Sequence, residues 1–149
     1  MKIQEREHPR VSGRRDPGQG LARVLGNRAG LLADISQTLA SRGINIETID
    51  AEEVHDTAVI ELTVDQYDEA LRSLRDAGFH AITEDALLVR LKDEPGALAK
   101  VAQRFKEAGI DLRSVRFIRR EKDFAFVALA TDQSEEAKAL IREYVVSGG

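Results

Sequence analysis

The segment Asn27-Arg28-Ala29-Gly30-Leu31-Leu32 occurs a second time, in related form, as Asp93-Glu94-Pro95-Gly96-Ala97-Leu98, 66 positions later. Matching pairs continue at this spacing, and they include Gly43/Gly109, Ile44/Ile110, Ile46/Leu112 and Ile49/Val115. Beyond a one-residue insertion the spacing becomes 67, and Asp65/Asp132 and Glu69/Glu136 still agree. Agreement on both sides of an insertion indicates that the chain contains a duplicated module.

Each copy predicts a first helix between this segment and a glycine. Asn27 is expected at or near the N-cap, where its side chain satisfies free backbone N–H groups. Gly43 and Gly109 are expected to end the helices, because glycine accepts the positive φ of a helix C-terminus at little cost. The predicted apolar stripe is Leu32, Ile35 and Leu39 in the first copy and Leu98, Val101 and Phe105 in the second.

Strands and a second helix complete each copy. In the first copy we expect strands at 21–25, 45–54 and 57–64, with His55-Asp56 as a turn, then a helix from Asp65 and a strand from Phe79. In the second copy the strands are expected at 87–91, 110–119 and 124–130. The order β-α-β-β-α-β is that of a ferredoxin-like sandwich. The predicted fold is therefore α+β, with two such modules in tandem, antiparallel sheets and helices on one face of each.

The expected layout is a flexible N-terminal extension over residues 1–19, a first module over 20–85 and a second over 86–149. The strand from Phe79 is expected to run on into 87–91, so that one long strand closes the first module and opens the second. The second module lacks residues for a last strand. Its open edge is expected to be filled by the N-terminal extension or by a partner chain, because unpaired backbone groups must be satisfied.

The composition limits the function. With 42% hydrophobic and 32% charged residues the sequence is typical of a soluble globular protein. The net charge of −4 argues against nucleic acid as the main partner, and no apolar run predicts a membrane span. There is no cysteine, which excludes disulfides and thiolate sites, and the first residues lack the apolar core of a secretion signal. We expect a cytoplasmic protein that uses no cofactor or metal.

The repeated turn has the chemistry of a small-anion site. A loop that opens a helix presents free N–H groups at the positive end of the helix dipole, which suits a carboxylate or a phosphate. Gly30 and Gly96 remove side-chain bulk, while Asn27 and Asp93 place polar groups at the rim. An Asp there suits an ammonium group, so the set fits both ends of an α-amino acid. The same residues are also ordinary helix-capping residues, and spacing alone favours that interpretation.

Both turns resemble the Asn/Asp-Arg-Pro-Gly-x-Leu turn of ACT domains. The junctions Arg42-Gly43-Ile44-Asn45-Ile46 and Ala108-Gly109-Ile110-Asp111-Leu112 resemble that family's passage into its second strand. The resemblance covers about residues 20–146 and is closest to the free-standing tandem type, which has no catalytic domain. Ala29 departs from the pattern, because it replaces the usual proline.

This resemblance implies an allosteric regulatory protein that binds a free amino acid where ACT modules meet. The implied ligand contacts are Asn27, Arg28, Ala29, Gly30, Leu31, Leu32, Asp93, Glu94, Pro95, Gly96, Ala97 and Leu98. Asn45, Ile46, Asp111 and Leu112 are implied to face the ligand from across the interface. The implied partners are a second copy, joined through edge strands as a homodimer, and a metabolic enzyme.

The second strands carry opposite charges at matched positions. Glu47, Asp50 and Glu53 of the first copy correspond to Arg113, Arg116 and Arg119 of the second. If these edge strands meet, opposite charges favour pairing of the first copy with the second over pairing of like copies. The alternative is a set of separate solvated charges, each worth little. The sequence supports both interpretations equally.

Three other classes of function compete with this interpretation of the sequence. An enzyme is disfavoured, because His8, His55 and His80 are scattered and no nucleophile elbow or phosphate loop occurs. An RNA-binding sandwich needs aromatic residues on the sheet face, and the first copy has none to match Phe117, Phe124 and Phe126. The strongest alternative is a structural or regulatory subunit that binds no ligand and recruits a metabolic enzyme.

Overall fold

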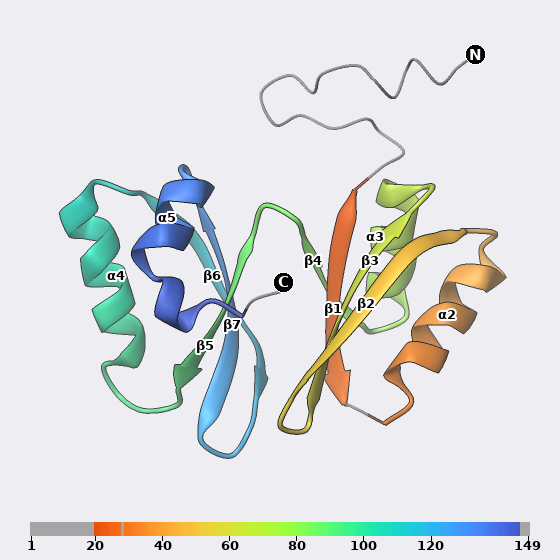
Figure 1. Cartoon of the computed structure of the whole chain (residues 1–149), viewed down its shortest axis with the longest axis horizontal. Helices are drawn as coiled ribbons and strands as arrows, with labels where there is room; N and C mark the ends of the chain where they lie inside the picture. Colours follow the sequence, from red (N-terminus) through yellow and green to blue (C-terminus); the bar gives the residue numbers. More distant parts are fainter. Residues whose placement is uncertain (1–19, 28, 147–149) are drawn as a thin grey trace, which may run out of the picture.

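The computed structural model describes residues 20–27 and 29–146. These residues form four layers, in which two antiparallel sheets stack face to face and a pair of helices covers the outer side of each sheet (Figure 1). The first half of the chain builds one sheet with its helices, and the second half builds the other. The predicted α+β fold with tandem ferredoxin-like modules is confirmed.

The first half has the predicted β-α-β-β-α-β order. Its elements are β1 (Leu21–Asn27), α2 (Leu31–Ser41), β2 (Ile46–Val54), β3 (Thr57–Val64), α3 (Tyr67–Asp76) and β4 (His80–Thr83). All pairings are antiparallel and the strand order is β2-β3-β1-β4, so β2 lies at one edge. The hairpin turns at His55, whose φ of 57° is left-handed, and β3 has the predicted bounds.

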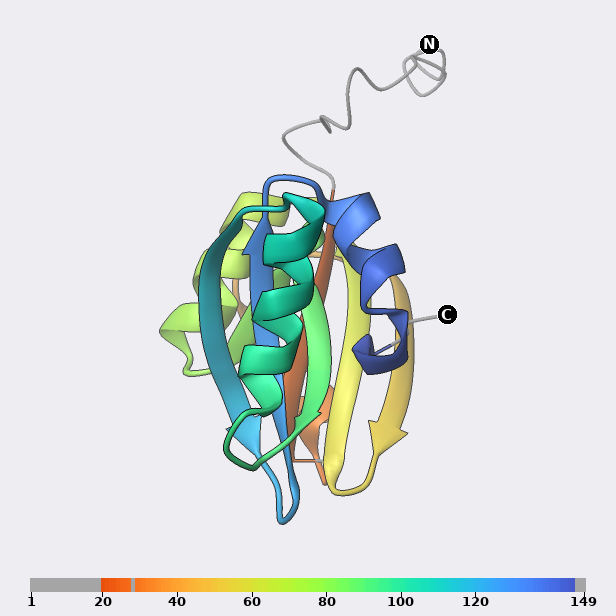
Figure 2. The ribbon, with the colours of Figure 1, turned by 90° about the vertical axis from the view of Figure 1, so that its left-hand side faces the viewer.

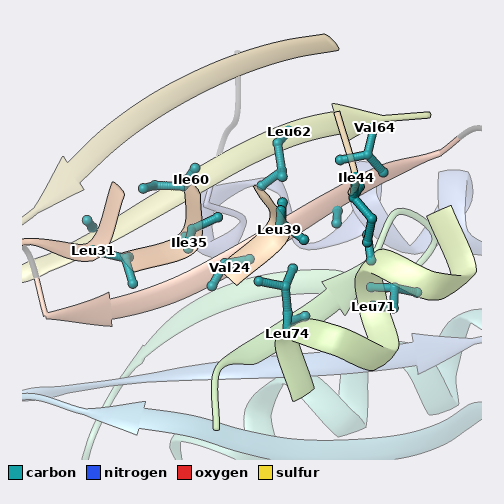
Figure 3. Packing of buried hydrophobic residues seen from close by; sticks show 14 residues of the cluster. Val24, Leu31, Ile35, Leu39, Ile44, Ile60, Leu62, Val64, Leu71 and Leu74 are labelled. Atoms are coloured by element: carbon teal, nitrogen blue, oxygen red, sulfur yellow. The ribbon is translucent and has the colours of Figure 1, made fainter. Parts of the chain in front are cut away.

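The core of the first half lies between this sheet and α2 and α3 (Figure 3). Leu31, Ile35 and Leu39 of α2 are buried, four residues apart. The predicted stripe was wrong at its first position, because Leu32 is 46% exposed. The helix begins at Leu31, immediately after Gly30, and this start turns Leu31 rather than Leu32 towards the sheet.

The second half repeats the plan with a shorter ending. Its elements are β5 (Leu87–Lys92), α4 (Ala97–Ala108), β6 (Leu112–Arg120), β7 (Phe124–Thr131), α5 (Ser134–Leu140) and the 3-10 turn η1 (Arg142–Tyr144). The strand order is β5-β7-β6, so β6 lies at an edge as β2 does. Val101 and Phe105 of α4 are buried in the core of this half. Leu98 is half-buried and packs against the same cluster.

The expected long strand through residues 79–91 is wrong, because β4 and β5 belong to different sheets. Residues 84–86 turn between them: the Ala86 N–H donates to the Thr83 carbonyl, and the Thr83 hydroxyl donates to the Asp85 carboxylate. Arg23 of β1 donates to the Ala86 carbonyl at 2.6 Å, and Ser134 donates to the Asp85 carbonyl at 3.1 Å. Side chains from both halves therefore hold this connection.

The described chain ends beside β5, where the second half would place its fourth strand. Val145 forms a single antiparallel bridge with Val89, and the Val146 N–H donates to the Leu88 carbonyl at 2.8 Å. This pairing occupies part of the edge of β5 that was expected to be open. The N-terminal extension expected to fill that edge, residues 1–19, lies outside the described residues, as do residues 147–149.

The two sheets share an apolar core of their own. Its buried residues come from both sheets: Leu25, Val59 and Ile82 on one side, and Leu88, Ile118, Phe126, Ala128 and Val146 on the other. At one end of this contact His55 stacks on Phe124, with ring centroids 6.0 Å apart, and the Arg90 guanidinium donates to His55 Nε2 at 3.1 Å. Within one chain the halves thus meet through sheet faces, and β2 and β6 remain edges of separate sheets.

Candidate functional site

The first turn leads from β1 into α2. Asn27 is the last residue of β1, and its Oδ1 accepts the N–H of Ala29 at 3.2 Å. Gly30 is the N-cap, with φ 79°, so Asn27 shapes the turn from three residues before the cap. Asn27, Ala29, Gly30 and Leu32 are exposed, Leu31 is buried, and Arg28 lies outside the described residues.

The second turn leads from β5 into α4 and is held by backbone bonds. The Asp93 N–H donates to the Asp123 carbonyl, and the Glu94 N–H donates to the Lys92 carbonyl, both at 2.9 Å. Gly96 is the N-cap, with φ 90°. Residues 93–96 are exposed, whereas Ala97 and Leu98 are half-buried.

No side chain in the described part of the chain caps either helix. In α4 the Ala97 N–H donates to the Glu94 carbonyl at 3.3 Å. The other first N–H groups of each helix have no partner within it, so both turns present N–H donors at a positive helix end. A Cβ built on Gly30 or Gly96 would meet no atom within 4 Å. The positive φ, rather than a lack of room, therefore requires glycine at these two positions.

The two turns differ in charge. Arg120 of β6 donates to the Asp93 carboxylate at 2.6 Å, and its guanidinium also lies over the Phe117 ring, 4.4 Å from the centroid. Asn27 has no such cation among its described contacts. Sequence reasoning missed Arg120, although a run of arginines along the second strand was visible. No local pattern indicated that this arginine reaches back to Asp93.

The starts of the second strands lie away from the turns. The 11 residues of α2 span about 16 Å, and Asn45 and Ile46 follow its far end. The second half has the same arrangement, with Asp111 and Leu112 beyond α4. In Figure 1 both turns lie at the lower end of the molecule, and both strand starts lie at the upper end. One chain therefore does not bring the two predicted parts of a site together.

The strand starts have a structural role of their own. The backbone N–H of Asn45 donates to Asp65 Oδ1, and that of Asp111 donates to Asp132 Oδ1, both at 3.0 Å. Ile46 and Leu112 are half-buried and pack against the cores of their halves. These contacts fix the position from which each second strand leaves its helix.

Other site types find little support in residues 20–27 and 29–146. No three His, Asp or Glu side chains in this range are grouped to hold a metal ion. None of the helices in this range is long and apolar enough to cross a membrane. A shallow hollow lined by Asp68, Leu71, Arg72, Arg75 and Asp76 lies along α3 and includes none of the predicted residues.

Solved structures with a similar arrangement include protein BT0572 from Bacteroides thetaiotaomicron, at 22% identity and a TM-score of 0.45, covering 88% of this chain and 92% of that one. The regulatory subunit of aspartate kinase from Thermus thermophilus is similar at 21% identity, with a TM-score of 0.39 and coverage of 87% and 93%. The acetolactate synthase small subunit from Thermotoga maritima is similar at 15% identity, with a TM-score of 0.37 and coverage of 87% and 90%. The sequence matches no curated protein.

The sequence profile of the ACT domain matches the chain twice, over residues 22–78 and 86–140. The two matches span more than half of the chain and correspond to the two halves of the structure. They also agree with the resemblance of the two glycine turns. The chain therefore belongs to the ACT domain family, whose members are regulatory domains that bind amino acids.

Proposed function

We propose that this chain is a cytoplasmic, non-catalytic regulatory protein that binds a free amino acid at its two glycine turns and controls a metabolic enzyme. The observation that carries the proposal is the pair of uncapped helix starts behind Gly30 and Gly96. Each has a left-handed glycine, open space in front of it and an oxygen-bearing side chain at the rim.

The proposed ligand chemistry follows from these groups. The free N–H groups at the start of α2 or α4 would receive the α-carboxylate at the positive end of the helix. The Asn27 or Asp93 side-chain oxygen would receive the α-ammonium group. A phosphate has no cationic group for this side-chain oxygen to bind, whereas a zwitterionic amino acid can interact with both the N–H groups and the oxygen.

A second copy would complete each site. In the part of the chain that the structure describes, β2 and β6 are edge strands, and Ile49 and Val115 on them are 42% and 37% exposed. Exposed edges of this kind favour pairing with another strand. Antiparallel pairing of second strands would bring the start of one strand towards the glycine turn of the other copy, which supplies the part missing within one chain.

The site at Asn27 is proposed as the stronger of the two. Asp93 already holds Arg120, so a ligand ammonium must compete with a guanidinium there. Asn27 is neutral, and its oxygen holds only the Ala29 N–H among the described contacts. The same ion pair supports the alternative function, a regulatory subunit that binds no ligand, at least for the second turn.

A thermal-shift screen of the full chain against the twenty amino acids tests the proposal. We expect saturable stabilisation by a small subset of them, worth about 2.7 kcal/mol at 100 times the dissociation constant. A uniformly flat screen would reject ligand binding and favour the ligand-free subunit.

The site variant is Gly30→Val, and Gly43→Val is its matched control. Both glycines have a positive φ, 79° and 72°, and open space around them. Both substitutions should lower the melting temperature of the ligand-free protein through backbone strain. Only Gly30→Val should abolish the further shift caused by the amino acid; equal loss in both variants would place the ligand elsewhere.

A further inference from the structure

The two second strands form a complementary pair of open edges. β2 carries Glu47, Asp50 and Glu53, and β6 carries arginines at the three equivalent positions. Within residues 20–27 and 29–146, each strand has a neighbour on one side only, β3 for β2 and β7 for β6. Among the described residues, neither Asp50 nor Arg116 has an ion-pair partner. The central charge of each edge is therefore available to a second copy.

The two edges also present their side chains in matching alternation. Ile49 pairs with Leu62 on the helix-covered face of its sheet, and Asp50 pairs with Glu61 on the opposite face. In β6, Phe117 pairs with Val127 on the helix-covered face, and Arg116 pairs with Ala128 on the opposite face. Each strand thus has an exposed apolar residue on its helix side and a charged residue on the other.

One antiparallel register places opposite charges next to each other on one face of the sheet and exposed apolar residues next to each other on the other face. If Asp50 lies opposite Arg116, then Ile49 lies opposite Phe117, since the numbers of paired residues have a constant sum. Ile49 is 42% exposed and Phe117 is 43% exposed, so their contact would bury apolar surface that the single chain leaves in water. Opposite charges and apolar pairs facing each other across strands stabilise a sheet.

Pairing of like edges is unfavourable in the equivalent register. Two β2 strands would place Asp50 opposite Asp50, and two β6 strands would place Arg116 opposite Arg116. The acidic edge is already crowded, since burial and the nearby charges of Glu61 and Asp50 raise the pKa of Glu52. A second acidic strand would add to this repulsion, whereas a basic strand would relieve it.

We propose that β2 of one copy pairs antiparallel with β6 of a second copy, with Asp50 opposite Arg116. In Figure 2, β6 lies at the left side of the double sheet and β2 at the right. The contact is therefore head to tail, and the assembly either closes into a ring or continues to grow. This inference rests on the proposed association through edge strands, but it does not depend on amino-acid binding.

The same register determines which residues of the second copy would lie near each ligand site. Extended past the irregularity between Leu112 and Ser114, the register brings the start of β6 of the second copy close to Val54. Both Val54 and Asn27 pair with Thr57 in the first copy. The turn at Gly30 would therefore face the start of β6, with Asp111, rather than the start of another β2. Each site would combine the turn of one half with the second strand of the other half.

Directed disulfide formation tests the register, because the natural chain contains no cysteine. Ile49→Cys and Phe117→Cys proteins are mixed without amino acid under mild oxidation. Linked dimers should form about tenfold faster than in a mixture of Ile49→Cys with Asp76→Cys, an exposed position on α3, because paired strands raise the effective concentration. Equal rates, or equally fast linkage of Ile49→Cys with itself, would overturn the proposal.

Charge exchange gives a second measurement that does not depend on disulfide geometry. Asp50→Arg gives two basic edges and Arg116→Asp gives two acidic ones, so each variant alone should associate about tenfold more weakly than the natural chain in sedimentation. Their mixture should recover association, whereas Glu107→Arg on α4 should change nothing. Association of either variant at natural strength would refute the pairing. A flat amino-acid screen would reject only the proposed ligand.

Discussion

At the scale of single residues, Asp65 and Asp132 have the same role in the two halves. The Asp65 carboxylate accepts the Asn45 N–H at 3.0 Å, and its own N–H donates to the Asn45 carbonyl at 3.2 Å. Asp132 makes the same reciprocal pair with Asp111, at 3.0 and 3.3 Å. These bonds tie the start of the second strand to the end of the third. The repeated aspartate in the sequence is explained by this bond.

Asp132→Ala should lower the free energy of unfolding by about 1 kcal/mol, because it removes an acceptor from the Asp111 N–H. Asp132→Asn keeps an acceptor oxygen at the same place and should retain most of the stability. Urea unfolding of both variants measures the difference. If the Asn variant is as unstable as the Ala variant, charge rather than hydrogen bonding explains the repeated aspartate.

At the scale of elements, the start of α2 decides which side chains reach the core. Gly30 at φ 79° ends the turn, and Leu31 becomes the first helical residue. Buried positions then recur every four residues, at Leu31, Ile35 and Leu39. Leu32 lies on the exposed side, beside the proposed ligand.

Leu31→Ala and Leu32→Ala form a matched pair of adjacent substitutions. Leu31 is 5% exposed, so its truncation should leave a cavity and cost about 2–4 kcal/mol of unfolding free energy. Leu32→Ala should change stability by less than about 0.5 kcal/mol, because the side chain is exposed. Chemical denaturation checks both values, and the reverse order would mean that α2 starts one residue later.

At the scale of the whole molecule, the sheet-to-sheet core makes one body of two duplicated halves. Phe126 of β7 is fully buried in this core, in one cluster with Leu25 and Val59 of the first sheet and Leu88 of its own. Phe105 of α4 is equally buried, but it lies in the second half's own core. Substituting each phenylalanine in turn therefore distinguishes contacts that couple the two halves from contacts that stabilise one half alone.

Phe126→Ala and Phe105→Ala should each cost about 3–5 kcal/mol of unfolding free energy. Hydrogen exchange should distinguish them. Phe126→Ala should speed exchange in β1 and β3 of the first half, because it removes a contact between the sheets. Phe105→Ala should act mainly on α4 and the strands beneath it. Equal exchange in β1 and β3 for both variants would mean that Phe126 does not couple the halves.

The sequence by itself determined the features that depend on nearby residues. Duplication, the order of elements, the hairpin at His55 and the glycine turns were all readable, because periodicity and glycine conformations act over a few positions. The candidate turns at Asn27 and Asp93 were found in the same way. The opposite charges of the second strands were also visible from spacing alone.

Only the tertiary structure decided which surfaces meet. It divided the expected strand at 79–91 between two sheets, covered the inner sheet faces with each other and brought Arg120 to Asp93. Each of these outcomes depends on contacts between residues far apart in the chain, where packing selects among alternatives that local pattern leaves equal. The inner sheet faces became a shared core, and β2 and β6 each lie at an edge of their own sheet among the described strands.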